Sequence, residues 1–336
     1  MFSLIVLNYN GDELLRECLE SIAAQSDRDF ELLLIDNAST IPWRHALPAS
    51  LQNQTVVLEN ESNLGYAEGN NVAIRRARGT WVVLLNNDAA LEPDFLAQAR
   101  RMISEHPGYR MFAPQIVVRD AREIIDSAGV GVFLDGTSRC RGWQESRRAY
   151  QQPAEVLGPV GSVAIYHREI FSEVGLLDPD FFCYLEDSDL LLRAQWMGYR
   201  ALYCPVLRAF HSKSSTLGVA TPQKAYLVER NRIWVAVKNF PLSLLLLSPL
   251  ITFFRYALQA CAAAFDMGIA GRFVRSYAWF QLPGILFHAY RDAGVLLPSM
   301  IRKRREIHRT RRVSRLRYLA MLWRFRLTWR DFALKE

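Results

Sequence analysis

The residues with the clearest chemical potential lie where an apolar segment ends in Asn86-Asn87-Asp88. The uninterrupted apolar run from Trp81 to Leu85 predicts a strand buried on both faces. Ligands of open α/β sheets collect at the carboxyl ends of the strands, so Asp88 stands where a hard oxygen ligand would meet a divalent cation. The alternative is an ordinary Asn/Asp turn before a helix that starts near Glu92-Pro93.

Three carboxylates form a second candidate site. Glu186, Asp187 and Asp189 stand where a helix should begin, because apolar residues follow them at helical spacing. Acidic residues favour helix N-termini through the helix dipole, so capping is the alternative. Three carboxylates in four positions exceed what capping needs, and a carboxylate that faces a cleft can act as a general base.

A histidine follows the last predicted strand, which covers residues 201–204. His211 opens a Ser-rich segment, and Lys213 follows two positions later. A lone histidine can be structural or can take part in a site, and the residues alone leave both possibilities open.

The elements that must position these residues are strands and helices that alternate along the chain. Further apolar runs of strand length cover residues 2–7, 30–35, 54–58 and 160–166. This alternation predicts an α/β fold with a mostly parallel central sheet and right-handed crossovers. Asn and Asp side chains follow the first four predicted strands, which points to one ligand cleft; they are Asn8, Asn10, Asp36, Asn63, Asn70, Asn71 and Asn86 to Asp88.

Two common nucleotide-binding motifs are missing from the sequence. The first predicted strand is not followed by G-x-G-x-x-G, and G-x-x-x-x-G-K-[ST] does not occur. A Rossmann dinucleotide site and a P-loop are therefore disfavoured. Residues 108–160 lack a regular pattern and include a basic stretch at 138–148, so we expect a variable, partly flexible insertion there.

The amino-acid composition is that of a folded protein with a hydrophobic core. Half of the 336 residues are apolar, enough for a sizeable core in one large domain or two. The five cysteines are scattered without a C-x-x-C spacing, which favours reduced thiols in a cytosolic compartment. The sequence enters an apolar strand-like run at once, without a basic region before it, so a secretory signal is not expected.

The charge is divided unevenly along the chain. Residues 1–220 contain 20 Lys/Arg and 28 Asp/Glu, whereas residues 221–336 contain 21 Lys/Arg and 6 Asp/Glu. Between residues 302 and 330 lie 12 Lys/Arg and one acid, with Leu316, Leu319, Trp323 and Leu327 expected on one helical face. A basic amphipathic helix of this kind indicates an anionic membrane surface, with a solvated charge run as the alternative. Nucleic acid is disfavoured because no recognition motif accompanies the charge.

An apolar segment precedes this basic region. Residues 239–265 contain one charge, Arg255, which divides them into stretches of 16 and 10 residues, and two prolines interrupt the first. A membrane span needs roughly 20 consecutive apolar residues. We therefore expect a re-entrant or interfacial helical hairpin or buried core helices rather than a broken transmembrane span. Residues 276–290 form a second short uncharged stretch.

Five ordered pieces of the sequence carry a resemblance to a known family. They are Val6-Leu-Asn-Tyr-Asn-Gly11, Leu34-Ile-Asp-Asn-Ala-Ser39, Asn63-Leu-Gly-Tyr-Ala-Glu-Gly-Asn-Asn71, Leu84-Leu-Asn-Asn-Asp88 and Tyr184-Leu-Glu-Asp-Ser-Asp189. Together they resemble the family-two inverting nucleotide-sugar glycosyltransferases with a GT-A fold, in particular the bacterial rhamnosyltransferase-like branch. The resemblance covers about residues 1–240. The D-x-D motif of that family is reduced here to Asn86-Asn87-Asp88.

The resemblance implies a role for each candidate residue. Asp36 would accept the imide N–H of uracil or thymine, and Asn8, Asn10, Asn63, Asn71 and Asn87 would shape the donor pocket. Asp88 would bind Mg²⁺ or Mn²⁺, His211 would complete the metal or diphosphate site, and Lys213 could assist. Asp187 would be the general base, with Glu186 and then Asp189 as second choices.

The expected protein is thus a glycosyltransferase domain at residues 1–240, followed by a helical, membrane-associating region at 241–336. It would transfer a sugar such as rhamnose from a UDP- or dTDP-sugar to a saccharide or lipid-linked acceptor in the synthesis of cell-surface polysaccharide. Its expected location is the cytoplasmic face of the inner membrane, as a peripheral or monotopic protein. Two other functions stay open: a nucleotidyltransferase acting on a sugar phosphate, and a non-catalytic, membrane-bound sugar-nucleotide-binding subunit.

Overall fold

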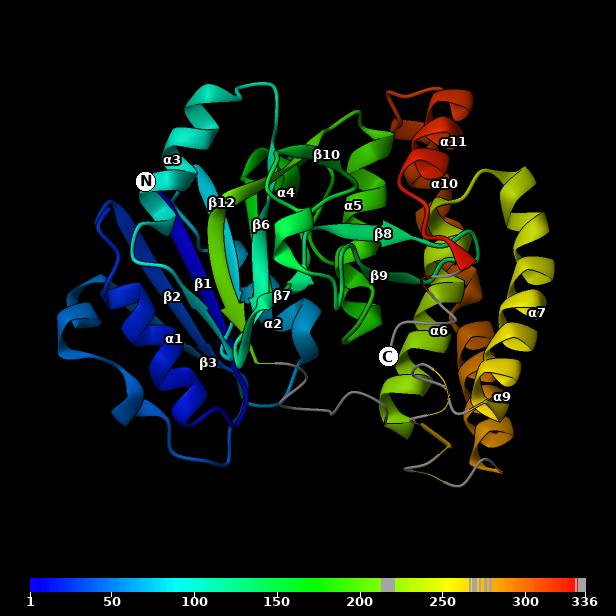
Figure 1. Cartoon of the computed structure of the whole chain (residues 1–336), viewed down its shortest axis with the longest axis horizontal. Helices are drawn as coiled ribbons and strands as arrows, with labels where there is room; N and C mark the ends of the chain where they lie inside the picture. Colours follow the sequence, from blue (N-terminus) through cyan, green and yellow to red (C-terminus); the bar gives the residue numbers. More distant parts are fainter. Residues whose placement is uncertain are drawn as a thin grey trace. The chain divides into compact units, whose positions relative to one another are not determined.

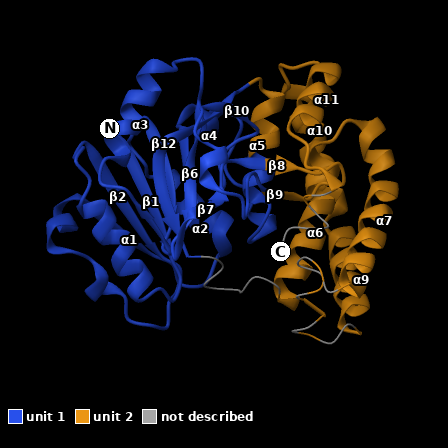
Figure 2. Cartoon of the chain, in the orientation of Figure 1, with its two compact units in different colours: residues 1–130, 140–190, 199–213 blue, residues 131–139, 191–198, 214–336 orange. Residues whose placement is uncertain are grey.

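The strands predicted from apolar runs are present and belong to one sheet. The computed structural model describes residues 1–212, 221–265, 280–329 and 331, together with residues 267, 271, 273, 274 and 277 (Figure 1). Contacts divide the chain into two units (Figure 2): unit 1 is residues 1–130, 140–190 and 199–213, and unit 2 is residues 131–139, 191–198 and 214–336. Residues 222–239 form a helix that belongs to unit 2, and the predicted change of role at residue 240 stays a prediction.

Unit 1 is built on a ten-stranded sheet with the main order β10-β12-β6-β11-β4-β1-β2-β3. Pairing among β4, β1, β2 and β3 is parallel, as predicted. The strands of this half are β1 (Phe2–Asn8), β2 (Phe30–Asp36), β3 (Thr55–Glu59) and β4 (Trp81–Asn86). Their register places Asn8 opposite Asp36 and Leu7 opposite Asn86. The polar ends of three strands therefore meet at one edge.

The other half of the sheet is mixed rather than mostly parallel. Here β11 (Val163–His167) is antiparallel to both neighbours, β4 and β6 (Met111–Val118). β6 is parallel to β12 (Ala201–His211) and antiparallel to β7 (Ala121–Ser127). The remaining members are β5 (Ala89–Leu91), paired with β12, and β10 (Ala154–Val156), while β8 (Val130–Val132) and β9 (Ser138–Cys140) form a separate pair.

Two proline-containing strands correct the sequence prediction. Residues 108–160 are not a flexible insertion, because β6 lies inside the sheet and its residues are buried. The strand at 201–204 also continues to His211. The pairing of β6 with β12 shifts register between Cys204, opposite Pro114, and Arg208. Because proline cannot donate to a ladder, Pro114 and Pro205 fit at this irregularity and obscure both strands in the sequence.

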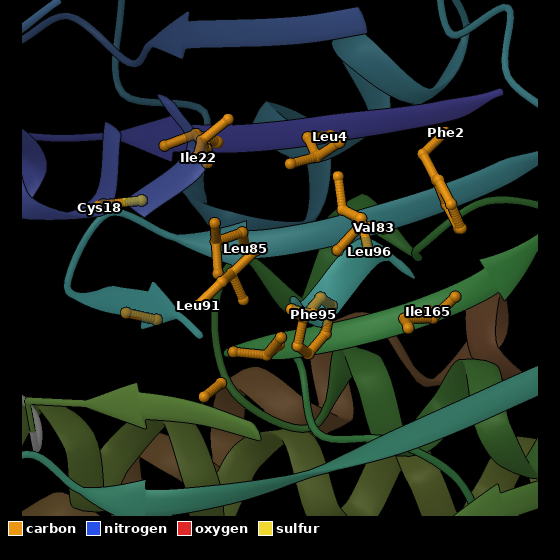
Figure 3. Close-up of a cluster of buried hydrophobic side chains, with 14 of the residues drawn as sticks. Phe2, Leu4, Cys18, Ile22, Val83, Leu85, Leu91, Phe95, Leu96 and Ile165 are labelled. Carbon is orange, nitrogen blue, oxygen red and sulfur yellow. The ribbon is translucent and has the colours of Figure 1, made fainter. Parts of the chain in front are cut away.

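Helices cover both faces of the parallel half. α1 (Glu13–Ala23) and α3 (Phe95–Glu105) bury Cys18, Ile22, Phe95 and Leu96 against β1 and β4 (Figure 3). Successive strand side chains alternate between faces. Thus Leu4 and Val6 join this core, whereas Leu7 contacts α2 (Gly65–Ile74) at Gly69. α4 (Glu169–Glu173) follows β11, and α5 (Glu186–Trp196) begins in unit 1.

Unit 2 contains the helices that follow the sheet in the sequence. They are α6 (Pro222–Asn239), α7 (Leu242–Ala264), α9 (Gln281–Val295), α10 (Leu297–Thr310) and α11 (Arg315–Arg324). The apolar segment is one continuous helix despite Pro249 and Arg255. The basic region is two helices, and Leu327 lies beyond α11 and packs on Phe133, so the predicted single apolar stripe is not formed.

Candidate active site

Asn8 is the centre of a hydrogen-bonded group at the end of β1. Its amide nitrogen donates to Asp36 Oδ1 at 3.1 Å and to Ser39 Oγ at 3.2 Å. Its oxygen accepts from the Gly11 backbone N–H at 3.1 Å and from Asn87 Nδ2 at 2.9 Å. Asn8 is fully buried, so its orientation is fixed by these partners and it joins the ends of β1, β2 and β4.

Asp36 is buried at the end of β2 and is held as an acceptor. Besides Asn8, the backbone N–H of Ser39 donates to its Oδ2 at 3.1 Å. Asn10 lies beside it in the left-handed region, with φ of 53°, and its side-chain oxygen accepts from the Thr40 backbone N–H at 2.8 Å. These bonds fold the loops after β1 and β2 onto one another.

The other two predicted donor-pocket asparagines bond to the loop after β2 and to the segment before the acidic helix. Asn63 Oδ1 accepts from Asn37 Nδ2 at 2.8 Å and from the Gly65 backbone N–H at 2.9 Å. Asn71 donates to the Leu177 carbonyl at 2.8 Å and accepts from the Leu177 N–H at 3.1 Å. Asn71 thus holds the segment that leads to the acidic helix, and its contact with a donor stays a prediction.

Asp88 and His211 meet at a second position on the same edge. Asp88 Oδ1 lies 3.2 Å from His211 Nε2, and Asp126 Oδ2 lies 2.9 Å from His211 Nδ1. The strands explain the meeting, because His211 is opposite Ala89 across the β12–β5 pair and Asp126 is on β7. Burial by itself lowers the pKa of His211, but hydrogen bonds and charge from Asp126 and Asp88 outweigh it and raise the pKa to about 10.

This pair would fit a divalent cation whose remaining ligands come from outside the protein. Neighbouring ligands of an octahedral ion at about 2.1 Å lie about 3 Å apart, close to the separation of the Asp88 and His211 atoms. Asp126 supplies the carboxylate that commonly orients the second ring nitrogen of a metal-binding histidine. Within the described residues, no group of three or more His, Cys, Asp or Glu side chains could hold a metal by itself. The protein would therefore supply two ligands, and oxygens of a substrate or water the rest.

At the start of α5, Asp187 takes part in a close contact with Gly161, which also contacts Tyr66. The backbone N–H of Gly161 donates to Asp187 Oδ2 at 3.0 Å, and the carbonyl of Gly161 accepts from the Tyr66 hydroxyl at 2.5 Å. A side chain at position 161 would put its Cβ 2.8 Å from that hydroxyl oxygen. Glycine at this position therefore allows β11, α2 and the acidic helix to converge.

The loop before α5 carries backbone strain. Phe182, Tyr184 and Leu185 have φ values of 63°, 70° and 68°. Gly65, with φ of +75°, lies directly against Phe182, and the N–H of Ala67 donates to the Phe182 carbonyl at 3.2 Å. Strained non-glycine residues persist where surrounding contacts hold them, and they cluster at functional sites. This loop sets the position of Glu186 and Asp187.

The three carboxylates of this group differ in their burial and in the hydrogen bonds and charges around them. Burial raises the pKa of Glu186 well above its ordinary value, and the charges of Asp187 and Asp189 raise it further. Burial also raises the pKa of Asp187, but hydrogen bonds from Gly161 and Ser188 stabilise its anion. These hydrogen bonds therefore favour the anion of Asp187. Asp187 is partly exposed, whereas Asp189 is fully buried, so Asp187 is the carboxylate placed to meet an external hydroxyl.

Sequence reasoning missed three residues at these positions. Asp126 lies in the segment that was expected to be partly flexible. Gly161 contributes a backbone N–H and a carbonyl, and Tyr66 contributes a hydroxyl, so neither was among the acids, amides and histidine that were considered. Asp126 could have been found had β6 and β7 been recognised as strands. Lys213, a candidate at the diphosphate site, lies outside the described residues.

Comparison with known proteins identifies the class. A family model described as Glycosyl transferase family 2 matches residues 3–175, just over half of the chain. The chain therefore belongs to glycosyl transferase family 2, and the predicted glycosyltransferase class is confirmed.

Curated relatives match part of their length. The O-antigen biosynthesis protein RfbC of Myxococcus xanthus is 27% identical over 256 residues, which cover 71% of this chain and 20% of that protein. A PGL/p-HBAD biosynthesis glycosyltransferase of Mycobacterium bovis is 31% identical over 122 residues, 35% of this chain and 48% of that protein. The chain thus matches less than half the length of each of these relatives.

Solved structures establish the fold. S. aureus TarS 1–349 in complex with UDP has a TM-score of 0.52 at 18% identity, and the match covers 92% of this chain and 86% of that one. The mannosyltransferase PcManGT from Pyrobaculum calidifontis, in complex with GDP-Man and Mn²⁺, has a TM-score of 0.52 at 19% identity, with coverage of 88% and 86%. These similarities confirm the predicted GT-A-like glycosyltransferase fold.

Proposed function

We propose that the protein is an inverting glycosyltransferase that moves a sugar from a UDP- or dTDP-sugar to a saccharide or lipid-linked acceptor. The observation that carries this proposal is that unit 1, which contains most of the stretch matched to glycosyl transferase family 2, carries Asp36, the Asp88–His211 pair and Asp187. The relatives named for O-antigen and PGL/p-HBAD biosynthesis support a role in cell-surface polysaccharide synthesis. Neighbours bound to UDP or GDP-Man support a nucleotide-sugar donor, and rhamnose is the sugar suggested by sequence resemblance.

The donor is held through its base and its diphosphate. Asp36 accepts a hydrogen bond from the imide N–H of the base. Its carboxylate oxygens act as acceptors, and the bonds from Asn8 and Ser39 orient them. Asp88 and His211 hold Mg²⁺ or Mn²⁺, and neighbours solved with Mn²⁺ support the use of a divalent cation. When bound, the cation neutralises charge on the leaving diphosphate.

Asp187 carries out the proton transfer. Its carboxylate takes the proton of an acceptor hydroxyl as that oxygen forms a bond to the anomeric carbon. The bond from the anomeric carbon to the diphosphate oxygen breaks, and its electron pair leaves with the nucleoside diphosphate. Attack from the face opposite the leaving group inverts the configuration of the anomeric carbon. Glu186, whose pKa burial raises well above its ordinary value, is the second choice for this role.

A panel of nucleotide sugars tests the donor assignment. UDP-, dTDP- and GDP-sugars, dTDP-rhamnose among them, are compared by thermal stabilisation and by release of nucleoside diphosphate, with Mn²⁺ and with chelator. We expect a uracil or thymine donor to stabilise the protein most, and the metal to increase the effect. Preference for a guanine donor would contradict the role of Asp36, and full activity in chelator would contradict the metal assignment.

We also propose that the enzyme works at the cytoplasmic face of the inner membrane, as a peripheral or monotopic protein, where a lipid-linked acceptor would be found. The excess of 21 Lys/Arg over 6 Asp/Glu in residues 221–336 supports attraction to an anionic membrane surface. Exposed apolar side chains of unit 2 support the same location.

A further inference from the structure

Helix α7 exposes a long apolar face. Six large apolar side chains between its N-terminus and its middle are exposed: Leu242, Leu246, Leu247, Leu250, Phe253 and Phe254. Leu246, Phe253 and Phe254 have 73%, 64% and 53% of their surface accessible. Single exposed apolar residues are ordinary, but a contiguous apolar patch on a protein surface marks a site of interaction.

The opposite face of α7 is buried and is polar in its middle part. Ser248, Thr252 and Arg255 are the buried residues along its middle, and Arg255 is the helix's one charged residue. A helix on a soluble domain normally turns its apolar side inward and its polar side to water. The orientation of α7 is the reverse, which means that its apolar side is presented outward by the fold of unit 2 itself.

A buried group of four charges holds α7 in this orientation. Arg255 donates to Asp135 at 2.7 Å and to Glu229 of α6 at 2.9 Å and 3.0 Å. Arg232 of α6 donates to Glu229 at 2.5 Å and to the Thr252 hydroxyl of α7 at 3.2 Å. Two acids and two arginines are balanced, and removing α7 would leave buried charges without their partners, which is strongly unfavourable.

The exposed apolar surface continues on α9. Phe287 and Val295 of this helix are largely exposed. α9 is tied to the same charged group, because the Tyr290 hydroxyl accepts from Arg232 at 2.6 Å and lies 3.3 Å from the Tyr256 hydroxyl of α7. Both helices therefore present apolar side chains while their polar atoms meet inside unit 2.

The chemistry of this surface fits a lipid bilayer. Protein–protein interfaces are about as apolar as the remaining protein surface, whereas the exposed face of α7 carries no charged residue. Residues 221–336 have a large excess of arginine and lysine, which complements anionic lipid headgroups. Charge and apolarity together indicate an anionic leaflet as the occupant.

We propose that α7 inserts its exposed face into one leaflet of an anionic bilayer and lies along the surface without crossing it. Resting on the membrane location proposed above, this assigns the main contact to α7 rather than to the basic C-terminal helices. α7 is the one helix among the described residues that is long and apolar enough to cross a membrane. Crossing would separate Arg255 from Asp135 and Glu229 and leave it in hydrocarbon, whereas surface insertion keeps the group intact.

Vesicle flotation of the full chain tests the contact. Vesicles of phosphatidylcholine and phosphatidylglycerol are mixed with wild type and with a Leu246→Gln, Phe253→Gln, Phe254→Gln variant. We expect binding to weaken by about tenfold or more, because insertion strength scales with the apolar area that enters the bilayer. A matched control replaces three exposed apolar residues of unit 1, Ile41, Val56 and Val206, with glutamine and should bind as wild type does.

Three outcomes would overturn the proposal. Equal binding by the α7 variant and wild type would remove α7 as the contact. Loss of a dimer in sedimentation, without loss of vesicle binding, would assign the face to a second copy of the chain. Failure of wild type to bind vesicles would overturn the membrane location as well, while transfer to a soluble acceptor would still test the donor and base assignments.

Thiol labelling distinguishes surface insertion from crossing. Ser243 and Cys261 are both exposed near opposite ends of α7, so Ser243→Cys and the native Cys261 report on the two ends. Sealed vesicles that carry the protein are treated with a membrane-impermeant maleimide, and mass spectrometry of α7 peptides locates the label. Both positions follow the exposed face of α7 at helical spacing, so we expect the leaflet to protect both ends from the reagent and detergent to restore both labels. Labelling from opposite sides would show a spanning helix and overturn the inference.

Discussion

Two buried clusters of ionisable residues, one in each unit, behave in opposite ways. At the start of α5 in unit 1, Glu186 and Asp187 lie together, and burial raises the pKa of both. In unit 2, Glu229 is buried between Arg232 and Arg255. Burial alone would raise the pKa of Glu229, but the charges of the two arginines outweigh it and lower the pKa to about 2.

The difference lies in the partners rather than in the burial. Within the described residues, no ion pair to Lys or Arg reaches Glu186 or Asp187, and their stabilising bonds come from neutral groups. A carboxylate in such a place can exchange a proton and is suited to catalysis. A carboxylate that is neutralised by two arginines is fixed in its charge and serves to join helices. The first cluster should matter for rate and the second for stability.

The largest effect is expected for Asp187→Asn. Replacing the base with a neutral amide of the same shape should lower the transfer rate by about 10²- to 10⁴-fold. Donor affinity and thermal stability should change little. Product formation, donor titration and thermal unfolding measure the three quantities.

Asp180→Asn, in the segment before the same helix, is the matched control and should retain activity. Unchanged turnover of Asp187→Asn would exclude Asp187 as the base.

Arg255→Leu should show the reverse pattern. Removing one partner of a buried charged group costs about 3–5 kcal/mol, because Asp135 and Glu229 keep their charge without it. The free energy of unfolding, measured with urea, should fall by that amount.

Arg101→Leu breaks an exposed pair with Glu105 at 2.8 Å and should leave the unfolding midpoint nearly unchanged. Similar losses for the two variants would mean that the buried cluster adds nothing beyond a surface pair.

Asp126→Asn should weaken metal binding by about 10- to 100-fold, the usual effect of losing a carboxylate that orients a metal-binding histidine. Mn²⁺ binding is measured by electron paramagnetic resonance, without reference to activity. Asp126→Glu should recover part of the affinity, which a general loss of structure would not allow. Asp120→Asn, exposed in the adjacent turn, is the control. Equal Mn²⁺ affinity of Asp126→Asn and wild type would contradict the orienting role.

The smallest effect is an opposite dependence of stability on pH. The folded pKa of Glu186 is above its ordinary 4.5, so its contribution to stability is complete below pH 4.5 and is lost as pH rises through the folded pKa. The folded pKa of Glu229 is about 2, so its contribution is complete above pH 4.5 and is lost as pH falls toward 2. As pH rises, the unfolding midpoint of Glu186→Gln should therefore increase relative to wild type. The unfolding midpoint of Glu229→Gln should decrease relative to wild type over the same range. The same sign for both would remove the distinction between the clusters.

The parallel half of the sheet could be predicted because its signal is local. A run such as Phe2 to Leu7 is apolar throughout, and a strand covered on both faces by helices requires that pattern. β6 and the second half of β12 could not be predicted, because Pro114 and Pro205 interrupt them and the pairing tolerates both at a shift of register. Because these strands were not predicted, Asp126 was not identified as a candidate site residue.

The candidate site was predicted in parts. Asn8, Asp36 and Asp88 were identified because polar residues directly follow apolar strands, and the register of β1 with β2 and β4 brings the first two and Asn87 into hydrogen-bond contact. His211 was left between a structural role and a site. Its place depends on β12, which carries it to within 3.2 Å of Asp88.

The sequence by itself determined which groups were available: acids and amides at strand ends, three carboxylates at a helix start, and an apolar segment with a single arginine. The tertiary structure decided their states, because ionisation and exposure depend on neighbours distant in the chain. Asp187 is held by the N–H of Gly161 and Arg255 by Asp135, contacts that cross 26 and 120 positions. The same long-range contacts turned the polar face of α7 inward and left its apolar face exposed.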